Sequence, residues 1–132
     1  MSIIVGYLPS KEGQAAVHAG IREAKLRGEK LLIVNSVRLG SLVDKAVASP
    51  EDLEEVSKLA NEAGIESTIL ESEYRDDFTE EFLRLADEQD VSLIVIGLRQ
   101  RTQVGKFIMG SHAQRILLQA NHPVLAVKAE QN

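Results

Sequence analysis

Short apolar runs rich in β-branched residues recur along the chain and are predicted to form strands. They cover residues 2–8, 30–37, 66–70, 92–97 and 123–128. The runs IIV, in the first of these, and LIVIG, in the fourth, are continuously apolar rather than alternating. A strand has this pattern when both faces of a parallel sheet are covered, because neither face then meets water. We therefore expect the first and fourth strands to be central.

The segments between these runs place apolar residues at helical spacing, which predicts helices with one buried stripe each. The stripes are formed by Val17, Ile21 and Ala24; by Leu53, Val56 and Ala60; by Phe78, Phe82, Leu85 and Ala86; and by Ala113, Ile116, Leu117 and Ala120. Gly28 follows the first stripe as a C-terminal cap, and Ser49-Pro50 opens the second helix. This alternation predicts right-handed crossovers and a parallel sheet with helices on both faces, a three-layer α/β fold.

The composition fits one domain over residues 1–132 and excludes several chemistries. A chain of 132 residues buries roughly two-thirds of its extended surface, which is enough for a self-sufficient core. Because the chain has no cysteine, disulfides, thiol catalysis, iron–sulfur clusters and cysteine-based zinc sites are excluded, and a cytoplasmic location fits. No apolar run approaches the ~18 residues of a membrane span, and no basic leader precedes the first strand. We expect a soluble, unprocessed protein.

The net charge of −5 argues against nonspecific nucleic-acid binding, which relies on basic surface. The charge is unevenly distributed, since residues 91–129 contain no acidic residue and carry +5, whereas the rest of the chain carries −10. The basic residues of that segment are Arg99, Arg101, Lys106, Arg115 and Lys128. A charged block is usually a solvated face, so its placement decides whether it has a role. The carboxylate pairs at 76–77, 80–81 and 87–88 are likewise expected to form the solvated face of the third helix.

Residues 97–112 connect the end of a buried strand to the start of a helix, and they contain the best candidate for a binding site. A helix N-terminus offers N–H donors and partial positive charge, so Gly110, Ser111 and the N–H of His112 can hold a phosphate. The cations around it would be Arg99, Arg101 and Lys106. In the alternative interpretation, Ser111 is only an N-cap and the arginines are solvated. Either way, the segment leaves from the carboxyl edge of the sheet, where open parallel sheets bind ligands.

Other chemistries have less support. Gly105-Lys106 is followed by Phe107 and no GxGxxG occurs, so neither a P-loop nor a dinucleotide fingerprint is present. The histidines share no helical face, which argues against a metal site; they are His18, His112 and His122. Ser111 beside His112 lacks the orienting carboxylate that nucleophilic catalysis needs. The acidic cluster and phosphoacceptor aspartate of a two-component receiver are missing after the first and third strands.

The sequence resembles the universal stress protein family in this segment. The family signature is Gly, two residues, Gly, nine residues, Gly and then Ser or Thr; this chain has Gly97, Gln100, Gly110 and Ser111 at the four positions. The runs IIVGYLPS and GEKLLIVNSV and the ending PVLAVK extend the resemblance over the whole chain. It implies a Rossmann-like domain with a five-stranded parallel sheet of order 3-2-1-4-5, in a cytoplasmic homodimer paired through the last strand, from Pro123 to Lys128. In one branch it also implies ATP or another adenine nucleotide, bound between the first and fourth strands.

The resemblance thus predicts a regulator that binds an adenine nucleotide, requires no metal and is not a dedicated enzyme. The nucleotide-binding residues would be Gly97, Arg99, Arg101, Lys106, Gly110, Ser111 and His112, with Gly97 letting the chain turn at the crevice. The nucleotide-binding branch has an Asp at the end of its first strand, where this chain has Tyr7-Leu8-Pro9. Tyr7 can stack on a base, whereas Leu8 accepts no hydrogen bond.

Two alternatives remain open on the sequence. One is a dimeric interaction module without nucleotide, its crevice closed by Tyr7, Leu8 and Gln100. The other is slow ATP hydrolysis at the same site.

Overall fold

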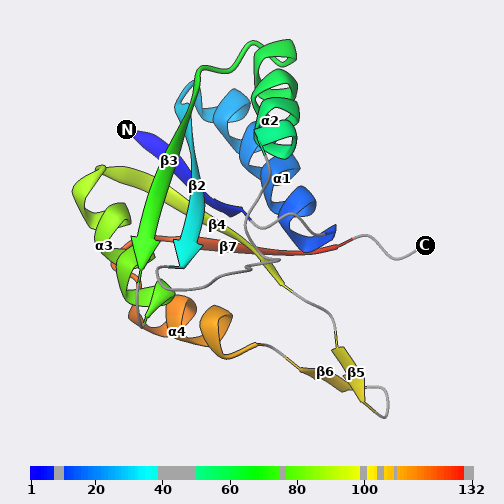
Figure 1. Ribbon diagram of the computed structural model, residues 1–132, viewed down its shortest axis with the longest axis vertical. Coiled ribbons are helices and arrows are strands. Elements are labelled where there is room, and N and C mark those ends of the chain that lie inside the picture. The colour runs from blue at the N-terminus through cyan, green and yellow to red at the C-terminus, as the bar shows by residue number, and fades with distance from the viewer. Residues whose placement is uncertain are drawn as a thin grey trace.

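The computed structural model describes residues 1–7, 11–38, 50–74, 77–98, 101–103, 106–108 and 110–129. Its elements are β1 (Ser2–Tyr7), α1 (Lys11–Arg27), β2 (Lys30–Arg38), α2 (Pro50–Glu62), β3 (Ser67–Tyr74), α3 (Phe78–Glu88), β4 (Val91–Leu98), β5 (Arg101–Gln103), β6 (Lys106–Ile108), α4 (Ser111–Gln119) and β7 (Val124–Lys128). Strands and helices alternate as the hydrophobic pattern predicts, with the short strands β5 and β6 added after β4 (Figure 1). No helix in the described ranges is long and apolar enough to cross a membrane.

The long strands form one parallel sheet in the order β3-β2-β1-β4-β7. With β7 as the fifth strand, this confirms the order 3-2-1-4-5. β1 is the middle strand, and Val5 pairs with Ile33 of β2 on one side and with Val95 of β4 on the other. All three of these side chains are fully buried. The central position predicted for the two continuously apolar runs is therefore confirmed.

Helices cover both faces of the sheet, so the fold has three layers (Figure 1). α1 and α2 pack on one face, where Val17 and Val56 meet Ile33 in one buried cluster. α3 and α4 pack on the other face, where Phe82 and Ile116 belong to a second cluster. The two clusters draw on alternate residues of the same strands, because successive side chains of a strand point to opposite faces.

Two parts of the strand arrangement differ from the prediction. β3 continues to Tyr74 although its apolar run ends at Leu70, because residues 71–74 pair with residues 35–38 of β2. Backbone pairing satisfies N–H and C=O groups whatever the side chains are, so the hydrophobic pattern does not reveal it. β5 and β6 form an antiparallel hairpin that was not predicted. Strands of three residues are too short to show a period.

α1 ends where the sequence predicts. Gly28 has a φ of 68°, in the left-handed region that favours glycine. The N–H of Glu29 donates to the carbonyl of Ala24 at 3.0 Å, which closes the last turn. The chain then enters β2 directly at Lys30.

Candidate functional site

The strand order reverses between β1 and β4, which are neighbours in the sheet. β1 is followed by α1 on one face, whereas β4 is followed, after the hairpin, by α4 on the other face. In open parallel sheets the ligand crevice lies beyond the carboxyl ends of the strands at such a point. The candidate site therefore consists of the ends of β1 and β4 and the beginning of α4 (Figure 1).

Gly97 lies inside β4, next to its last residue, and pairs with Val127 of β7. A Cβ atom at this position would overlap the backbone carbonyl of Glu12 in the first turn of α1. Only a residue without a side chain allows the helix to approach the strand this closely. The prediction that Gly97 lets the chain turn is therefore wrong: its φ is not positive, and the glycine provides room for α1.

The N-terminus of α4 is exposed and has no side-chain cap. Gly110 is the N-cap residue, with φ −67° and ψ 156°, and its carbonyl accepts from the N–H of Gln114 at 3.1 Å. Ser111 is the first helical residue and is exposed, so the alternative in which Ser111 is the N-cap is wrong. The first N–H groups of a helix have no carbonyl partner within it, and α4 has no acidic residue in its first turn. This end of α4 suits an anion.

His112 joins the first turn of α4 to the first turn of α3. Its Nδ1 lies 2.8 Å from the Oγ1 of Thr79, a hydroxyl that is fully buried. Its ring also meets the ring of Phe78 edge-on, with centroids 6.0 Å apart. Only the backbone N–H of His112 was assigned a role from the sequence, which contained no signal for this side-chain contact across 33 positions.

Asp77 and Arg115 form a second link between the same two helices. Two parallel hydrogen bonds join them, from Nη1 of Arg115 to Oδ1 at 2.9 Å and from Nη2 to Oδ2 at 2.8 Å. Asp77 also caps α3, because its Oδ1 accepts from the N–H of Glu80 at 3.2 Å. The hydrogen bonds from Arg115, followed by that N–H, hold the pKa of the Asp77 carboxyl below its ordinary value. The same pair raises the pKa of the Arg115 guanidinium.

This ion pair changes two interpretations drawn from the sequence. Arg115 belongs to the segment without acidic residues, yet in space its charge is opposed by a carboxylate of α3. Asp77 was expected on the solvated face of α3, yet it is half-buried against α4. The aspartate three positions before Glu80 is a recognisable N-cap signal, but its partner 38 positions away is not. The pair is neutral, so it adds no net charge beside the first turn of α4.

Several residues predicted for the site lie outside what the structure describes. Leu8, Arg99 and Gln100 are outside the described ranges. The backbones of Tyr7, Arg101 and Lys106 are placed in β1, β5 and β6, but their side chains are not described. Of the predicted nucleotide-binding residues, the structure places the side chains or backbone of Gly97, Gly110, Ser111 and His112 at the carboxyl edge of the sheet.

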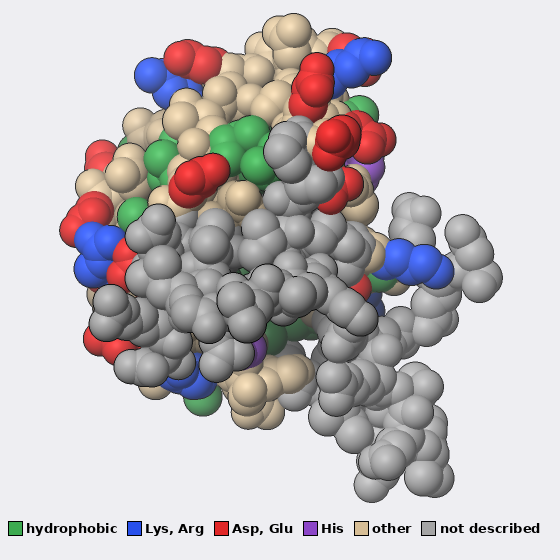
Figure 2. Space-filling model, in the orientation of Figure 1, with side chains coloured by type: hydrophobic (Ala, Val, Ile, Leu, Met, Phe, Trp, Pro, Cys, Tyr) green, Lys and Arg blue, Asp and Glu red, His purple; other side chains and the backbone are tan. Residues whose placement is uncertain are grey.

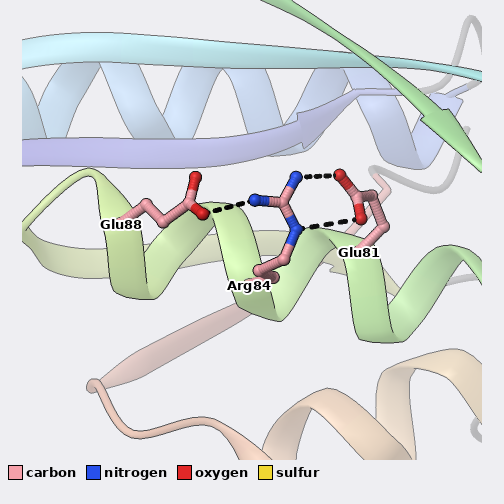
Figure 3. A network of polar contacts seen from close by, with 3 residues as sticks. All are labelled: Glu81, Arg84 and Glu88. Atoms are coloured by element: carbon pink, nitrogen blue, oxygen red, sulfur yellow. Dashed lines mark hydrogen bonds and ion pairs between the residues drawn. The ribbon is translucent and has the colours of Figure 1, made fainter.

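Of the other carboxylates predicted for the solvated face of α3, Glu80, Asp87 and Glu88 are exposed and Glu81 is partly exposed, whereas Asp76 lies outside the described residues. Arg84 bridges Glu81 and Glu88 on the exposed side of the helix (Figure 3). Its hydrogen bonds lower the pKa of Glu81, and the two glutamates raise the pKa of Arg84. Pairs one turn apart on a solvated helix contribute little to stability. Acidic and basic side chains are interspersed around the rim of the face in Figure 2, as expected of a solvated surface.

The described residues contain no group of histidine, aspartate and glutamate side chains that could hold a metal ion. His122 lies with its Nε2 3.1 Å from Oδ1 of Asp87, at the far end of α3 from Thr79. His18 is exposed on α1. The three histidines are therefore distributed over separate parts of the fold, as their sequence spacing predicts.

Known proteins are similar to this chain in sequence and in fold over nearly all of its length. Residues 1–128 match the family model Usp, the universal stress protein family. A universal stress protein of Mycolicibacterium smegmatis is 41% identical over 126 residues, which are 96% of this chain and 96% of that protein. A universal stress protein structure from Archaeoglobus fulgidus has a TM-score of 0.83 and 30% identity, covering 97% of this chain and 98% of that one. The structure of the Archaeoglobus fulgidus universal stress protein in complex with dAMP has a TM-score of 0.78 and 26% identity, with 97% and 98% covered. On sequence and structure alike, the chain belongs to the universal stress protein family.

Proposed function

We propose that this protein is a cytoplasmic regulator that binds an adenine nucleotide at the switch point between β1 and β4 and is not a dedicated enzyme. The observation that carries the proposal is the exposed N-terminus of α4 at the carboxyl edge of the sheet, with neither a capping side chain nor an acidic residue in its first turn. The relative from Archaeoglobus fulgidus in complex with dAMP supports an adenine nucleotide as the ligand. In this proposal residues 1–132 form one domain with one such site.

In this proposal the phosphates lie at the start of α4. Gly110 admits close approach, because among the described residues no side chain or distant backbone atom lies within 4 Å of the position that a Cβ atom would take there. Ser111 adds its hydroxyl, and the N–H groups of Ser111 and His112 donate to phosphate oxygens. The contacts of His112 and Arg115 with α3 hold this turn in a fixed position, so little order is lost on binding. Further cations would come from Arg99, Arg101 and Lys106, and Gly97 keeps the first turn of α1 against the crevice.

Isothermal titration with ATP, ADP and AMP tests the proposal. We expect saturable binding, and we expect Ser111→Ala combined with Arg99→Ala to weaken it by at least about tenfold, since a hydroxyl donor and a charge-assisted contact are lost together. The matched control is Ser57→Ala with Arg27→Ala, which removes the same groups from α2 and the end of α1 and leaves affinity unchanged. Absence of heat and of thermal stabilisation at millimolar nucleotide would contradict nucleotide binding. Steady phosphate release that Ser111→Ala abolishes would contradict the non-enzymatic role.

We also propose that two copies pair through β7, from Pro123 to Lys128. β7 is the last strand of the sheet, and its apolar residues are only half-buried. A groove of about 650 Å³ lies between α1 and β7, and its lining includes His18, Arg22 and Val127. Because of this groove, α1 does not cover the β7 edge of the sheet completely. Leu118 of α4, the helix that precedes β7 in the chain, is 85% exposed. Apolar sheet edges of this kind are normally covered or paired.

Light scattering during size exclusion checks the pairing. We expect a particle mass of twice the 14.5 kDa of one chain at micromolar concentration. The mass of a single chain would rule the dimer out. A dimer that binds no nucleotide would instead favour the interaction module, in which Tyr7, Leu8 and Gln100 close the crevice.

A further inference from the structure

Asn35 is a buried polar residue in an otherwise apolar stretch of β2. Its relative exposure is 3%, and the four preceding residues, 31–34, are all buried and hydrophobic. Its side-chain oxygen, Oδ1, has no hydrogen-bond partner among the described residues. A buried acceptor without a donor destabilises the folded state, so a fold that retains one requires an explanation. A leucine at this position would avoid the cost.

The position of Asn35 in the sheet places it next to the candidate site. It pairs with Tyr7, the last residue of β1, so the neighbouring strand ends beside it. By strand alternation it shares the face of Leu31 and Ile33, which is the face that α1 covers. Gly97, next to the end of β4, faces the same side, where it contacts the first turn of α1. β1 separates β2 from β4, so Asn35 and Gly97 are about two strand spacings, roughly 10 Å, apart across the sheet.

We infer that Oδ1 of Asn35 selects the base of the bound nucleotide by accepting a hydrogen bond from the exocyclic amine of adenine. The inference rests on the proposed nucleotide site and adds the residue that recognises the base. The unsatisfied atom is an acceptor, so its partner must bring a donor, and the 6-amino group of adenine is one. Hypoxanthine has a carbonyl oxygen at the same ring position, which would face Oδ1 with a second acceptor. A buried site built around one hydrogen bond rejects a ligand that cannot make it.

The selection predicts a preference between two nucleotides that carry the same phosphates. We expect the wild-type protein to bind ATP at least about tenfold more tightly than inosine triphosphate in isothermal titration, because the second leaves Oδ1 unpaired. Asn35→Leu removes the acceptor and is expected to bring the two affinities together. The matched control is Asn61→Leu, a substitution of an exposed asparagine on α2, which keeps the preference.

Thermal denaturation without nucleotide separates recognition from a structural role. If Oδ1 lacks a partner in the folded protein, Asn35→Leu leaves the melting temperature unchanged or raises it. A lower melting temperature for Asn35→Leu would show that the protein or a bound water satisfies the oxygen, and would overturn the inference. Equal wild-type affinities for ATP and inosine triphosphate would overturn it as well, and would leave the proposed nucleotide site in place. If neither nucleotide binds the wild-type protein, the proposed function fails and this inference fails with it.

Discussion

Replacing Gly97 by alanine is expected to destabilise the protein by about 3 kcal/mol, the upper range for overpacking a buried site. The added methyl group would overlap the backbone carbonyl of Glu12, and backbone atoms cannot move aside as the end of a flexible side chain can. Either the first turn of α1 or the end of β4 must shift. Urea denaturation followed by circular dichroism measures the loss as a lower midpoint at unchanged slope.

Gly6→Ala is the matched control, because Gly6 lies in the adjacent strand β1. A Cβ there meets the ring of Phe82 at 3.4 Å, an ordinary van der Waals contact. We expect this variant to keep nearly all of the wild-type stability. If Gly97→Ala is equally stable, the close approach of α1 is not what requires glycine in β4. If Gly97→Ala is destabilised as expected, nucleotide affinity should fall as well, since the shift of α1 or of β4 displaces one side of the proposed crevice.

Replacing Phe82 by alanine is expected to cost about 3–5 kcal/mol, the usual range for deleting a buried aromatic side chain. Phe82 is the largest of the fully buried side chains in the described part of the chain. It fills the space between α3 and the sheet, lying over Gly6 and 5.8 Å from the ring centroid of Phe78. Its removal would leave a cavity that the surrounding strands cannot close.

The same denaturation experiment measures this loss. Leu83→Ala serves as the comparison, because Leu83 is the next residue of α3 and is only partly buried against the same cluster. We expect Leu83→Ala to cost clearly less than Phe82→Ala. Comparable losses for the two variants would contradict the assignment of Phe82 as the centre of this half of the core.

The sequence predicted the elements that hydrophobic burial controls. β1 and β4 are continuously apolar because helices cover both faces of the sheet, and Gly28 ends α1 because glycine readily adopts a positive φ. The polar half of β3 and the hairpin β5–β6 were missed, since backbone pairing imposes no side-chain pattern. For the candidate site, the signature residues located the start of α4 at Gly110 and Ser111. They did not indicate what surrounds it.

Local sequence determined where the helices and the apolar strands form, which faces are apolar and which loop carries the family signature, because these depend on residues within a few positions of one another. The tertiary structure alone decided which distant groups meet: Asp77 with Arg115, Thr79 with His112, and Gly97 with the backbone of α1. It also left Oδ1 of Asn35 buried beside the end of β1, without a hydrogen-bond partner in the described part of the chain. Each of these contacts depends on how the helices pack across the sheet. Linear spacing therefore shows an acid-free segment and a polar residue in a strand, whereas packing shows that Arg115 is paired with Asp77 and that Oδ1 of Asn35 has no partner among the residues described.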